Sequence, residues 1–203
     1  MPAKHQLLVD NLNFSVLVDS LTSSYSLHAE SGDIIGISGT SGVGKSLLLK
    51  ALADLIPHQG NIQLNNQSQD TIEPYIWRTK VMLVPAESQW WLETVNEHFN
   101  ILEEHTLSKL NLTKAIKDKQ VHQLSTGEKQ RLSVLRALEK QPDVLLLDEV
   151  SANLDLNNTI ALEKVLIEFV QEQQGIIIWV SHDTHQLERI CTKCYQMTYE
   201  GMF

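Results

Sequence analysis

Gly39-Thr40-Ser41-Gly42-Val43-Gly44-Lys45-Ser46 is the stretch of sequence that decides the fold. It matches the phosphate-binding loop pattern G-x-x-x-x-G-K-[ST] at every fixed position. Glycines accept backbone conformations that side chains forbid, so successive N–H groups can turn toward phosphate oxygens. Lys45 supplies positive charge for the β- and γ-phosphates, and the Ser46 hydroxyl can ligate Mg²⁺. The stretch therefore predicts nucleotide contacts at these eight residues and at Leu47 after them.

The residues on either side of this loop predict a strand before it and a helix after it. Residues 33–38 are a short apolar run that enters the loop, and residues 47–55 are rich in helix-forming residues up to Pro57. Such a helix directs the positive end of its dipole at the bound phosphates.

Composition describes an ordinary globular protein and excludes several other classes. The 203 residues are 42% hydrophobic and 20% charged, enough for one α/β domain with a core. The formal net charge of −9 argues against a nucleic-acid partner, which would need clustered Lys and Arg. No apolar run has the length of a membrane span, and residues 1–6 lack the apolar core of a signal peptide, so we expect a cytoplasmic location.

Apolar runs that alternate with helical patterns predict the rest of the fold. Residues 143–148 and 176–180 are apolar strands, and between them apolar residues recur with helical spacing from Leu162 to Val170, with Gly175 just past the helix end. This alternation predicts a mainly parallel core sheet covered on both faces, in an α/β P-loop NTPase fold. Short β-like runs predict an additional antiparallel layer at residues 7–9, 15–18, 26–28 and 61–65. We expect a single domain over residues 1–203 that includes a small helical subdomain over residues 87–137.

Asp148-Glu149 follows directly on an apolar strand. A carboxylate at the carboxyl end of a central strand can reach the Mg²⁺ held by Ser46, directly or through water, which makes Asp148 the second predicted metal ligand. Glu149 can then act as the general base that polarises an attacking water. An acidic strand end alone is a weak signal, but it becomes strong beside the phosphate-binding loop.

Residues 124–131, Leu-Ser-Thr-Gly-Glu-Lys-Gln-Arg, predict the start of another helix. Ser125 fits an N-cap, and Glu128 three residues later completes a capping box. A well-capped helix with no further role explains this pattern by itself. A helix start with small residues, here Thr126 and Gly127, is also an anion site.

With these motifs in place, the chain resembles the ATP-binding cassette (ABC) ATPases, whose signature L-S-G-G-Q opens such a helix. That family carries the phosphate-binding loop, the signature and the acidic strand end in this order. Residues 151–155 resemble its D-loop, residues 181–183 resemble its switch-histidine segment, and Phe14 stands where the family places an adenine-stacking aromatic. The resemblance covers essentially the whole chain and implies ATP and Mg²⁺ as cofactors.

The resemblance also implies a site shared between two ABC subunits, here expected to be a homodimer. The phosphate-binding loop of one subunit faces the signature of the other, so that Ser125 and Gly127, with Thr126 and Glu128, lie near the partner's γ-phosphate. His182 would sense the γ-phosphate bound at Lys45, beside Glu149. Asp155 would bridge the subunits. Thr126 and Glu128 depart from the signature, and the extra side chain and negative charge predict a weaker phosphate contact.

Ala86 departs from the family pattern at the place of a glutamine that ligates Mg²⁺ and touches the transmembrane subunit. Alanine has no ligand atom, so either Glu87 or Gln89 takes over or water fills the position. We expect slower or less tightly coupled hydrolysis, because Ser46 and the acidic pair remain.

Trp90 and Trp91 follow in the region where the family receives a helix of the membrane subunit. Two adjacent tryptophans cannot both be buried on one face, so we expect one to be exposed. Exposed aromatics are enriched at interface hot spots. Burial of both in a subdomain core is the alternative.

The lone pair Cys191 and Cys194 has no second ligand pair, and the eight histidines show no metal-ligand spacing. We expect two structural thiols.

The resemblance implies the ATP-hydrolysing subunit of a membrane transporter, bound peripherally at the cytoplasmic face of the membrane to a transmembrane permease subunit. Residues 124–131, 145–155 and 179–183 look similar to small cassettes linked to iron or metal export. A non-transport ABC ATPase, acting as a mechanical switch or as an iron–sulfur assembly scaffold, is the alternative. A module that binds nucleotide without hydrolysing it is a third.

Overall fold

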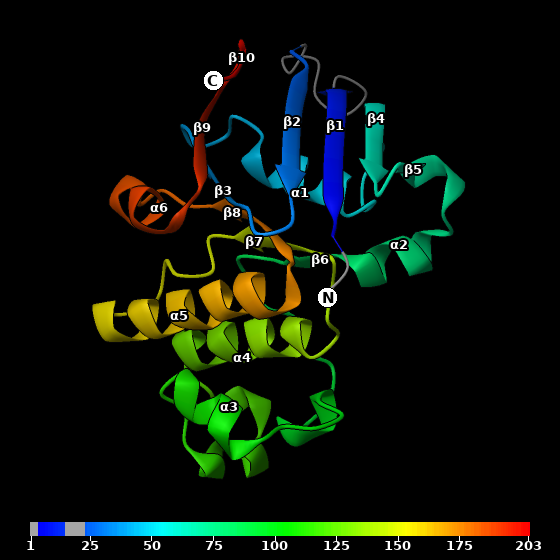
Figure 1. The fold of residues 1–203 in the computed structure, drawn as a ribbon. Helices are drawn as coiled ribbons and strands as arrows, with labels where there is room; N and C mark the ends of the chain where they lie inside the picture. Colours follow the sequence, from blue (N-terminus) through cyan, green and yellow to red (C-terminus); the bar gives the residue numbers. More distant parts are fainter. Residues whose placement is uncertain (1–3, 15–22) are drawn as a thin grey trace.

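The computed structural model describes residues 4–14 and 23–203 as two β-sheets with helices between and below them (Figure 1). The larger sheet has the strand order β10-β9-β3-β8-β7-β6. All of its neighbouring strands run parallel except the pair at one edge, β10 and β9. The strands are β3 (Ile34–Ser38), β6 (Val81–Val84), β7 (Val144–Asp148), β8 (Ile176–Val180), β9 (Lys193–Thr198) and β10 (Gly201–Met202).

The predicted antiparallel layer is confirmed as a separate sheet with the order β2-β1-β4-β5. Its strands are β1 (Gln6–Asn13), β2 (Tyr25–Glu30), β4 (Gln59–Leu64) and β5 (Gln67–Ser68). The predicted run at residues 15–18 lies outside the described residues. In β2, buried and exposed residues alternate strictly, as expected for a sheet with one face on the core.

The parallel sheet is covered on both faces, because neighbouring residues of its central strands enter different cores. In β7, Val144 and Leu146 pack with the antiparallel sheet and with α1 (Lys45–Leu52). Leu145 and Leu147 pack on the opposite side, against the cluster beneath the sheet. This explains why the strand is a continuous apolar run.

Most of the remaining helices lie below the parallel sheet (Figure 1). None of the helices in the described part of the chain combines the length and the hydrophobicity needed to cross a membrane. The helices are α2 (Pro74–Lys80), α3 (Glu104–Lys109), α4 (Thr126–Leu138), α5 (Leu156–Gln173), α6 (Thr184–Ile190), and the 3₁₀ turns η1 (Gln69–Thr71), η2 (Asn96–His98), η3 (Lys114–Asp118) and η4 (Val121–Gln123).

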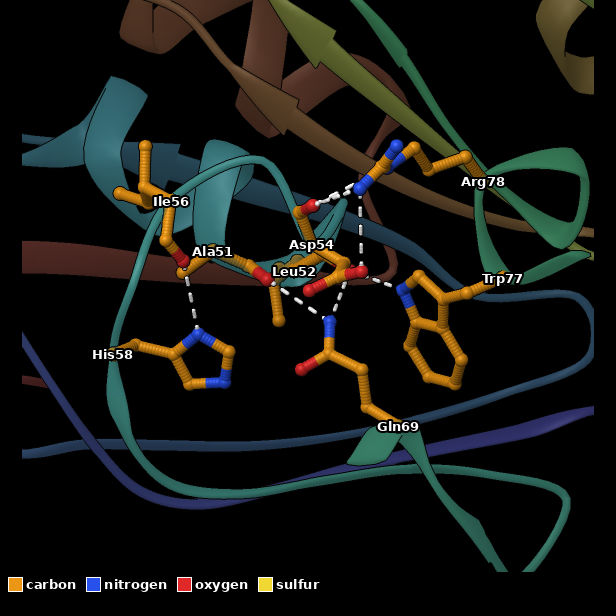
Figure 2. Close-up of polar contacts among 8 residues, drawn as sticks. All are labelled: Ala51, Leu52, Asp54, Ile56, His58, Gln69, Trp77 and Arg78. Carbon is orange, nitrogen blue, oxygen red and sulfur yellow. Dashed lines mark hydrogen bonds and ion pairs between the residues drawn. The ribbon is translucent and has the colours of Figure 1, made fainter. Parts of the chain in front are cut away.

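The end of α1 far from the phosphate-binding loop is anchored by side-chain donors from the segment after β5 (Figure 2). The indole N–H of Trp77 donates to the carbonyl of Leu52 at 2.8 Å, and the buried amide of Gln69 donates to the carbonyl of Ala51 at 3.1 Å. Arg78 donates to the carbonyl of Asp54 at 3.0 Å. The first two bonds are made to carbonyls in the last turn of α1 and the third to the turn that follows it, so together they hold this end of the helix in place.

The helix α5 ends just before Gly175, as predicted. The left-handed residue at this end is Gln174, with φ 57°. Gly175 is instead needed for space, because a Cβ there would lie 2.3 Å from Cζ of Phe169. The aromatic ring of α5 can therefore pack directly on the start of β8.

Candidate functional site

The parallel register brings the predicted site residues to one edge of the sheet. Ile37 at the end of β3 is paired with Val180 in β8, and Leu147 in β7 is paired with Trp179. The phosphate-binding loop, the Asp148-Glu149 pair and the segment beginning at Ser181 therefore leave the sheet side by side. Ligands of open parallel sheets bind at this carboxyl edge.

The phosphate-binding loop has the backbone conformation that its glycines predict. Gly39, Gly42 and Gly44 have φ values of 152°, 81° and 106°, in a region that favours glycine. A Cβ at Gly39 would also lie 2.4 Å from the carbonyl oxygen of Met197 in β9. The loop is thus held against its neighbouring strand as well as shaped by its own glycines.

The side chains of the loop divide between the core and the surface. Val43 is fully buried, and Leu47 packs against the core, so each can offer only its backbone to a ligand. Thr40, Ser41 and Ser46 are exposed.

The side chain of Lys45 folds back onto the phosphate-binding loop. Its ammonium group donates to the carbonyls of Gly39 at 2.8 Å and Thr40 at 3.2 Å. Burial lowers the pKa of Lys45, while the nearby Glu149 and Asp148 carboxylates act to raise it. The lysine and the acidic pair therefore share one electrostatic environment.

The donor chemistry around Lys45 fits Mg²⁺. The exposed Ser46 hydroxyl and the buried Asp148 carboxylate are oxygen donors of the kind that this hard cation takes, usually one or two protein groups with the rest from phosphates and water.

Glu149 and His182 are brought together from different strands. Nε2 of His182 lies 2.9 Å from Oε1 of Glu149. Glu149 has a φ of 50°, uncommon for a residue with a side chain, and its N–H donates to the carbonyl of Val180 at 3.0 Å. Backbone strain of this kind is often found at functional sites.

The capping box predicted at α4 is present. The Glu128 N–H donates to Oγ of Ser125 at 3.2 Å, and the Ser125 N–H donates to Oε2 of Glu128 at 2.8 Å. Ser125 and Thr126 are both exposed at this helix start. A Cβ at Gly127 would lie 3.2 Å from Cδ2 of Leu154, so this glycine lets the D-loop segment approach α4.

The negative charge of Glu128 is compensated within the chain. Lys119 lies 3.2 Å from its Oε1. Partial burial acts to raise the pKa of Glu128, but the hydrogen bond from the Ser125 backbone and the Lys119 ammonium outweigh it and lower the pKa overall.

Asp155 is exposed and caps the start of α5, which the sequence analysis did not anticipate. Its Oδ1 accepts from the Asn158 N–H at 2.9 Å, and its Oδ2 accepts from the Asn158 amide at 2.7 Å. The backbone hydrogen bond from Asn158 is the main cause of the lowered pKa of Asp155.

The placement of Phe14 contradicts its predicted role as an adenine-stacking aromatic. Its side chain is fully buried in the core and stacks on Tyr25, with 5.7 Å between ring centroids. It offers no open ring face to a base. Tyr199, which the sequence analysis did not single out, is 53% exposed, and its hydroxyl would lie 3.9 Å from a Cβ at Gly42. Only the three-dimensional pairing of β3 with β9 brings this aromatic to the phosphate-binding loop.

Ala86 is exposed, as are Glu87 and Gln89 near it. The Gln89 amide donates to the carbonyl of Glu87 at 3.2 Å, so it is engaged locally. The buried Gln130 of α4 donates to the carbonyl of Pro85 at 3.1 Å and fixes the start of this loop.

The tryptophan pair behaves as predicted, because Trp91 is 68% exposed while Trp90 is partly buried. The guanidinium of Arg136 lies 4.6 Å from the ring centroid of Trp90 and 4.7 Å from that of Trp91. Nε2 of His98 accepts from the backbone N–H of Trp91 at 3.1 Å. A hollow of about 290 Å³ lies beside this group, lined mainly by β6, the tryptophan loop and α4.

The two cysteines are free thiols at the end of α6 and in β9. Burial raises the pKa of Cys191 to about 12, which makes its reactive thiolate form scarce. Among the described residues, no group of three or more His, Cys, Asp or Glu side chains could hold a metal ion.

The fold and the edge site together define a nucleotide-binding protein of the P-loop class. A model of the ABC transporter family matches residues 22–152, well over half of the chain. The chain belongs to the ABC transporter family, and it is an ATP-binding ATPase of that family.

Individual relatives agree with this assignment. The chain is 32% identical to the phosphate import ATP-binding protein PstB of Aeropyrum pernix, over 95% of this chain and 86% of that one. It is 31% identical to the probable iron export ATP-binding protein FetA of Escherichia coli, over 89% and 80% of the two chains. The solved structure of cbiO1 from Clostridium perfringens, part of the ABC transporter complex cbiONQ, superimposes with a TM-score of 0.78 at 25% identity, over 97% of this chain and 86% of that one.

We predict that Tyr199→Ala weakens ATP binding about fivefold, because one aromatic contact contributes roughly 1 kcal/mol. Isothermal titration calorimetry with ATP and Mg²⁺ measures the change. Phe203→Ala is the control, since Phe203 is another exposed aromatic residue of the same hairpin, at 72%. An unchanged ATP affinity in Tyr199→Ala would exclude Tyr199 from the nucleotide site.

Proposed function

We propose that this chain is the ATP-hydrolysing subunit that powers a membrane transporter, pairing with a second ABC subunit and with a separate transmembrane permease subunit. The observation that carries the proposal is the Glu149 carboxylate, 2.9 Å from a ring nitrogen of His182, at the edge where the phosphate-binding loop begins. Such a pair can hold and activate one water molecule near a γ-phosphate.

In the proposed reaction, Glu149 accepts a proton from water while the water oxygen attacks the γ-phosphorus. The bond between that phosphorus and the β–γ bridging oxygen breaks, and ADP carries away the electron pair. Lys45 turns from the loop carbonyls to the β- and γ-phosphates and offsets their charge. His182 orients the Glu149 carboxylate and contacts the γ-phosphate, so these three residues form the proposed catalytic set.

We propose that Ser46 and Asp148 hold Mg²⁺ with the nucleotide phosphates. When bound, the ion neutralises charge on the β- and γ-phosphate oxygens. The Asp148 carboxylate lies at the end of a buried strand, so its position is fixed by the sheet.

We propose that the complete site forms between two copies of this chain. α1 packs on one face of the parallel sheet, with Leu48 and Leu49 in one core, and α4 packs on the other, with Leu132 and Val134 in the second core. The two helix axes are therefore about 20 Å apart, since packed layers are about 10 Å from one another.

A phosphate at one chain's Lys45 is then out of reach of the same chain's Ser125. A second copy supplies Ser125, Thr126, Gly127 and Glu128, and Asp155 lies on the exposed D-loop surface between the copies. This separation of the two helix starts supports pairing with a second ABC subunit, which we propose to be another copy of this chain.

We propose that the segment over residues 87–137 is a helical subdomain within one ABC ATPase domain, and that it carries the docking site for the permease. An exposed aromatic and cationic surface, of the kind found at hot spots, is formed by Trp90, Trp91 and Arg136. The hollow described above lies beside it. Docking there would hold the chain peripherally at the cytoplasmic face of a membrane.

For the cargo we propose iron or another metal moving outward, supported by the likeness to FetA. PstB, which is similarly close, is named for phosphate import, so the permease that copurifies from solubilised membranes is the deciding observation. A metal-efflux permease would support the proposal and an importer would overturn it. The names of these relatives favour transport over a mechanical switch or an iron–sulfur scaffold.

Glu149→Gln tests the proposed chemistry. We expect kcat for ATP hydrolysis to fall at least about 100-fold, the usual contribution of a general base. ATP affinity should change by less than about twofold, because Gln keeps the shape of the side chain. Phosphate release and ATP binding measure the two quantities, with Glu188→Gln on the exposed face of α6 as the control. Hydrolysis at the wild-type rate in Glu149→Gln would contradict the assignment of Glu149 as the general base.

Ala86→Gln tests the missing ligand. An added amide oxygen at this position should raise the ATPase rate or lower the Mg²⁺ concentration needed for half-maximal rate, by about threefold. Ala115→Gln, an exposed substitution in η3, should change neither. If Ala86→Gln leaves both quantities unchanged, Ala86 does not limit hydrolysis.

The double variant Trp90→Ala/Trp91→Ala tests docking. We expect association with membranes that contain the permease to fall at least about tenfold, since a hot-spot aromatic contributes about 2 kcal/mol. ATP affinity should stay the same because the pair lies away from the phosphate-binding loop. Tyr75→Ala, an exposed aromatic on α2, is the control in the same flotation assay. Wild-type association in the double variant would place the docking site elsewhere.

A further inference from the structure

A buried polar network lies behind the Glu149–His182 pair and is not used by the proposed reaction. At its centre is Gln186 of α6, which is 1% exposed. Its amide oxygen accepts from Oγ of Ser151 at 2.7 Å and from Oγ of Ser181 at 3.3 Å. Its amide nitrogen donates to Oε1 of Glu163 at 2.9 Å. One side chain thus joins three separate segments of the chain.

Two of these segments carry the proposed catalytic pair. Ser151 follows Glu149 by two residues, and Ser181 directly precedes His182. The Ser181 hydroxyl also accepts from the Asp183 N–H at 3.1 Å, which fixes the turn around His182. Gln186 therefore bonds to both loops at the point where they separate from β7 and β8.

The orientation of the Gln186 amide is determined by Glu163 of α5. Glu163 is 4% exposed, and its carboxylate can only accept hydrogen bonds, so it requires the NH₂ side of the amide. Arg189 donates to both oxygens of the Glu163 carboxylate, at 3.1 Å to Oε2 and at 2.5 Å to Oε1, so the carboxylate is paired on its far side. The amide oxygen is then left for the two serine hydroxyls.

We propose that Gln186 is a positioning residue for ATP hydrolysis, which holds the loop of Glu149 and the loop of His182 at a fixed separation through the Ser151 and Ser181 hydroxyls. Glu163 and Arg189 set the direction of its amide. The inference rests on the proposed roles of Glu149 and His182. A displacement of about 1 Å in a reacting group can cost about 100-fold in rate, so a shared acceptor between the two loops has a direct kinetic effect.

Gln186→Glu is the sharpest test, because it keeps the size of the side chain and replaces the group that donates to Glu163 with an acceptor. Two carboxylates then face one another in a buried place, and they must separate or share a proton. We expect kcat to fall at least about tenfold while KM for ATP changes by less than about twofold, since the phosphate-binding loop is not touched.

The swap Glu163→Gln/Gln186→Glu is the matched rescue. The new amide at 163 can donate to the new carboxylate at 186 and accept from Arg189, while the carboxylate still accepts from both serines. We expect kcat to return to within about threefold of the wild type. A network that only stabilises the fold would lower thermal stability in both variants without this recovery of kcat.

Gln171→Glu on exposed α5 surface controls for the added charge. If Gln186→Glu does not fold, Ser151→Ala replaces it, and we expect kcat to fall about threefold or more at constant KM. A wild-type kcat in Gln186→Glu, or in Ser151→Ala if that variant is used, overturns the inference. So does a swap that stays as slow as the single variant. Failure of the proposed function would look different: Glu149→Gln would then hydrolyse ATP at the wild-type rate, whatever the Gln186 variants do.

Discussion

The parallel register of β3, β8 and β7 is the constraint on which the candidate site depends. Because Ile37 and Asp148 both pair with Val180 at the end of β8, the phosphate-binding loop emerges beside two loops that lie more than 100 residues further along the sequence. The register is itself maintained by burial on both faces, since each central strand contributes to two cores. Loosening either core would therefore move the proposed catalytic residues as well as reduce stability.

Much of this arrangement could be predicted from the sequence, because the decisive signals are local. The glycines of the phosphate-binding loop, the acids after β7 and the capping box at Ser125 are each encoded within about eight residues. The predicted adenine-stacking role of Phe14 was wrong because its burial comes from contact with Tyr25 across the antiparallel sheet, which no short pattern reveals. Gln186 was missed for the same reason, since its partners lie on α5 and on two loops, between 5 and 35 residues away in sequence.

The surroundings of Glu128 offset the negative charge that this residue adds to the signature. Glu128 would place a negative charge near a phosphate, but Lys119 and the Ser125 N–H already pair with it. Ser125 accepts a hydrogen bond from its own helix and keeps its hydroxyl proton for another acceptor. The altered signature is thus compatible with a phosphate contact.

The network around Gln186 also connects the start of α4 to the catalytic edge of the same chain. Gly127 lets Leu154 approach α4, and the Leu154 N–H donates to the carbonyl of Ser151 at 3.0 Å. Ser151 bonds in turn to Gln186, which bonds to Ser181 beside His182. In the proposed dimer, α4 would contact the nucleotide of the partner, while His182 acts on the nucleotide of its own chain. The start of α4 and the loop of His182 are therefore packed into one connected part of the chain, so a change in the position of α4 bears on the same hydrogen-bond network that holds His182.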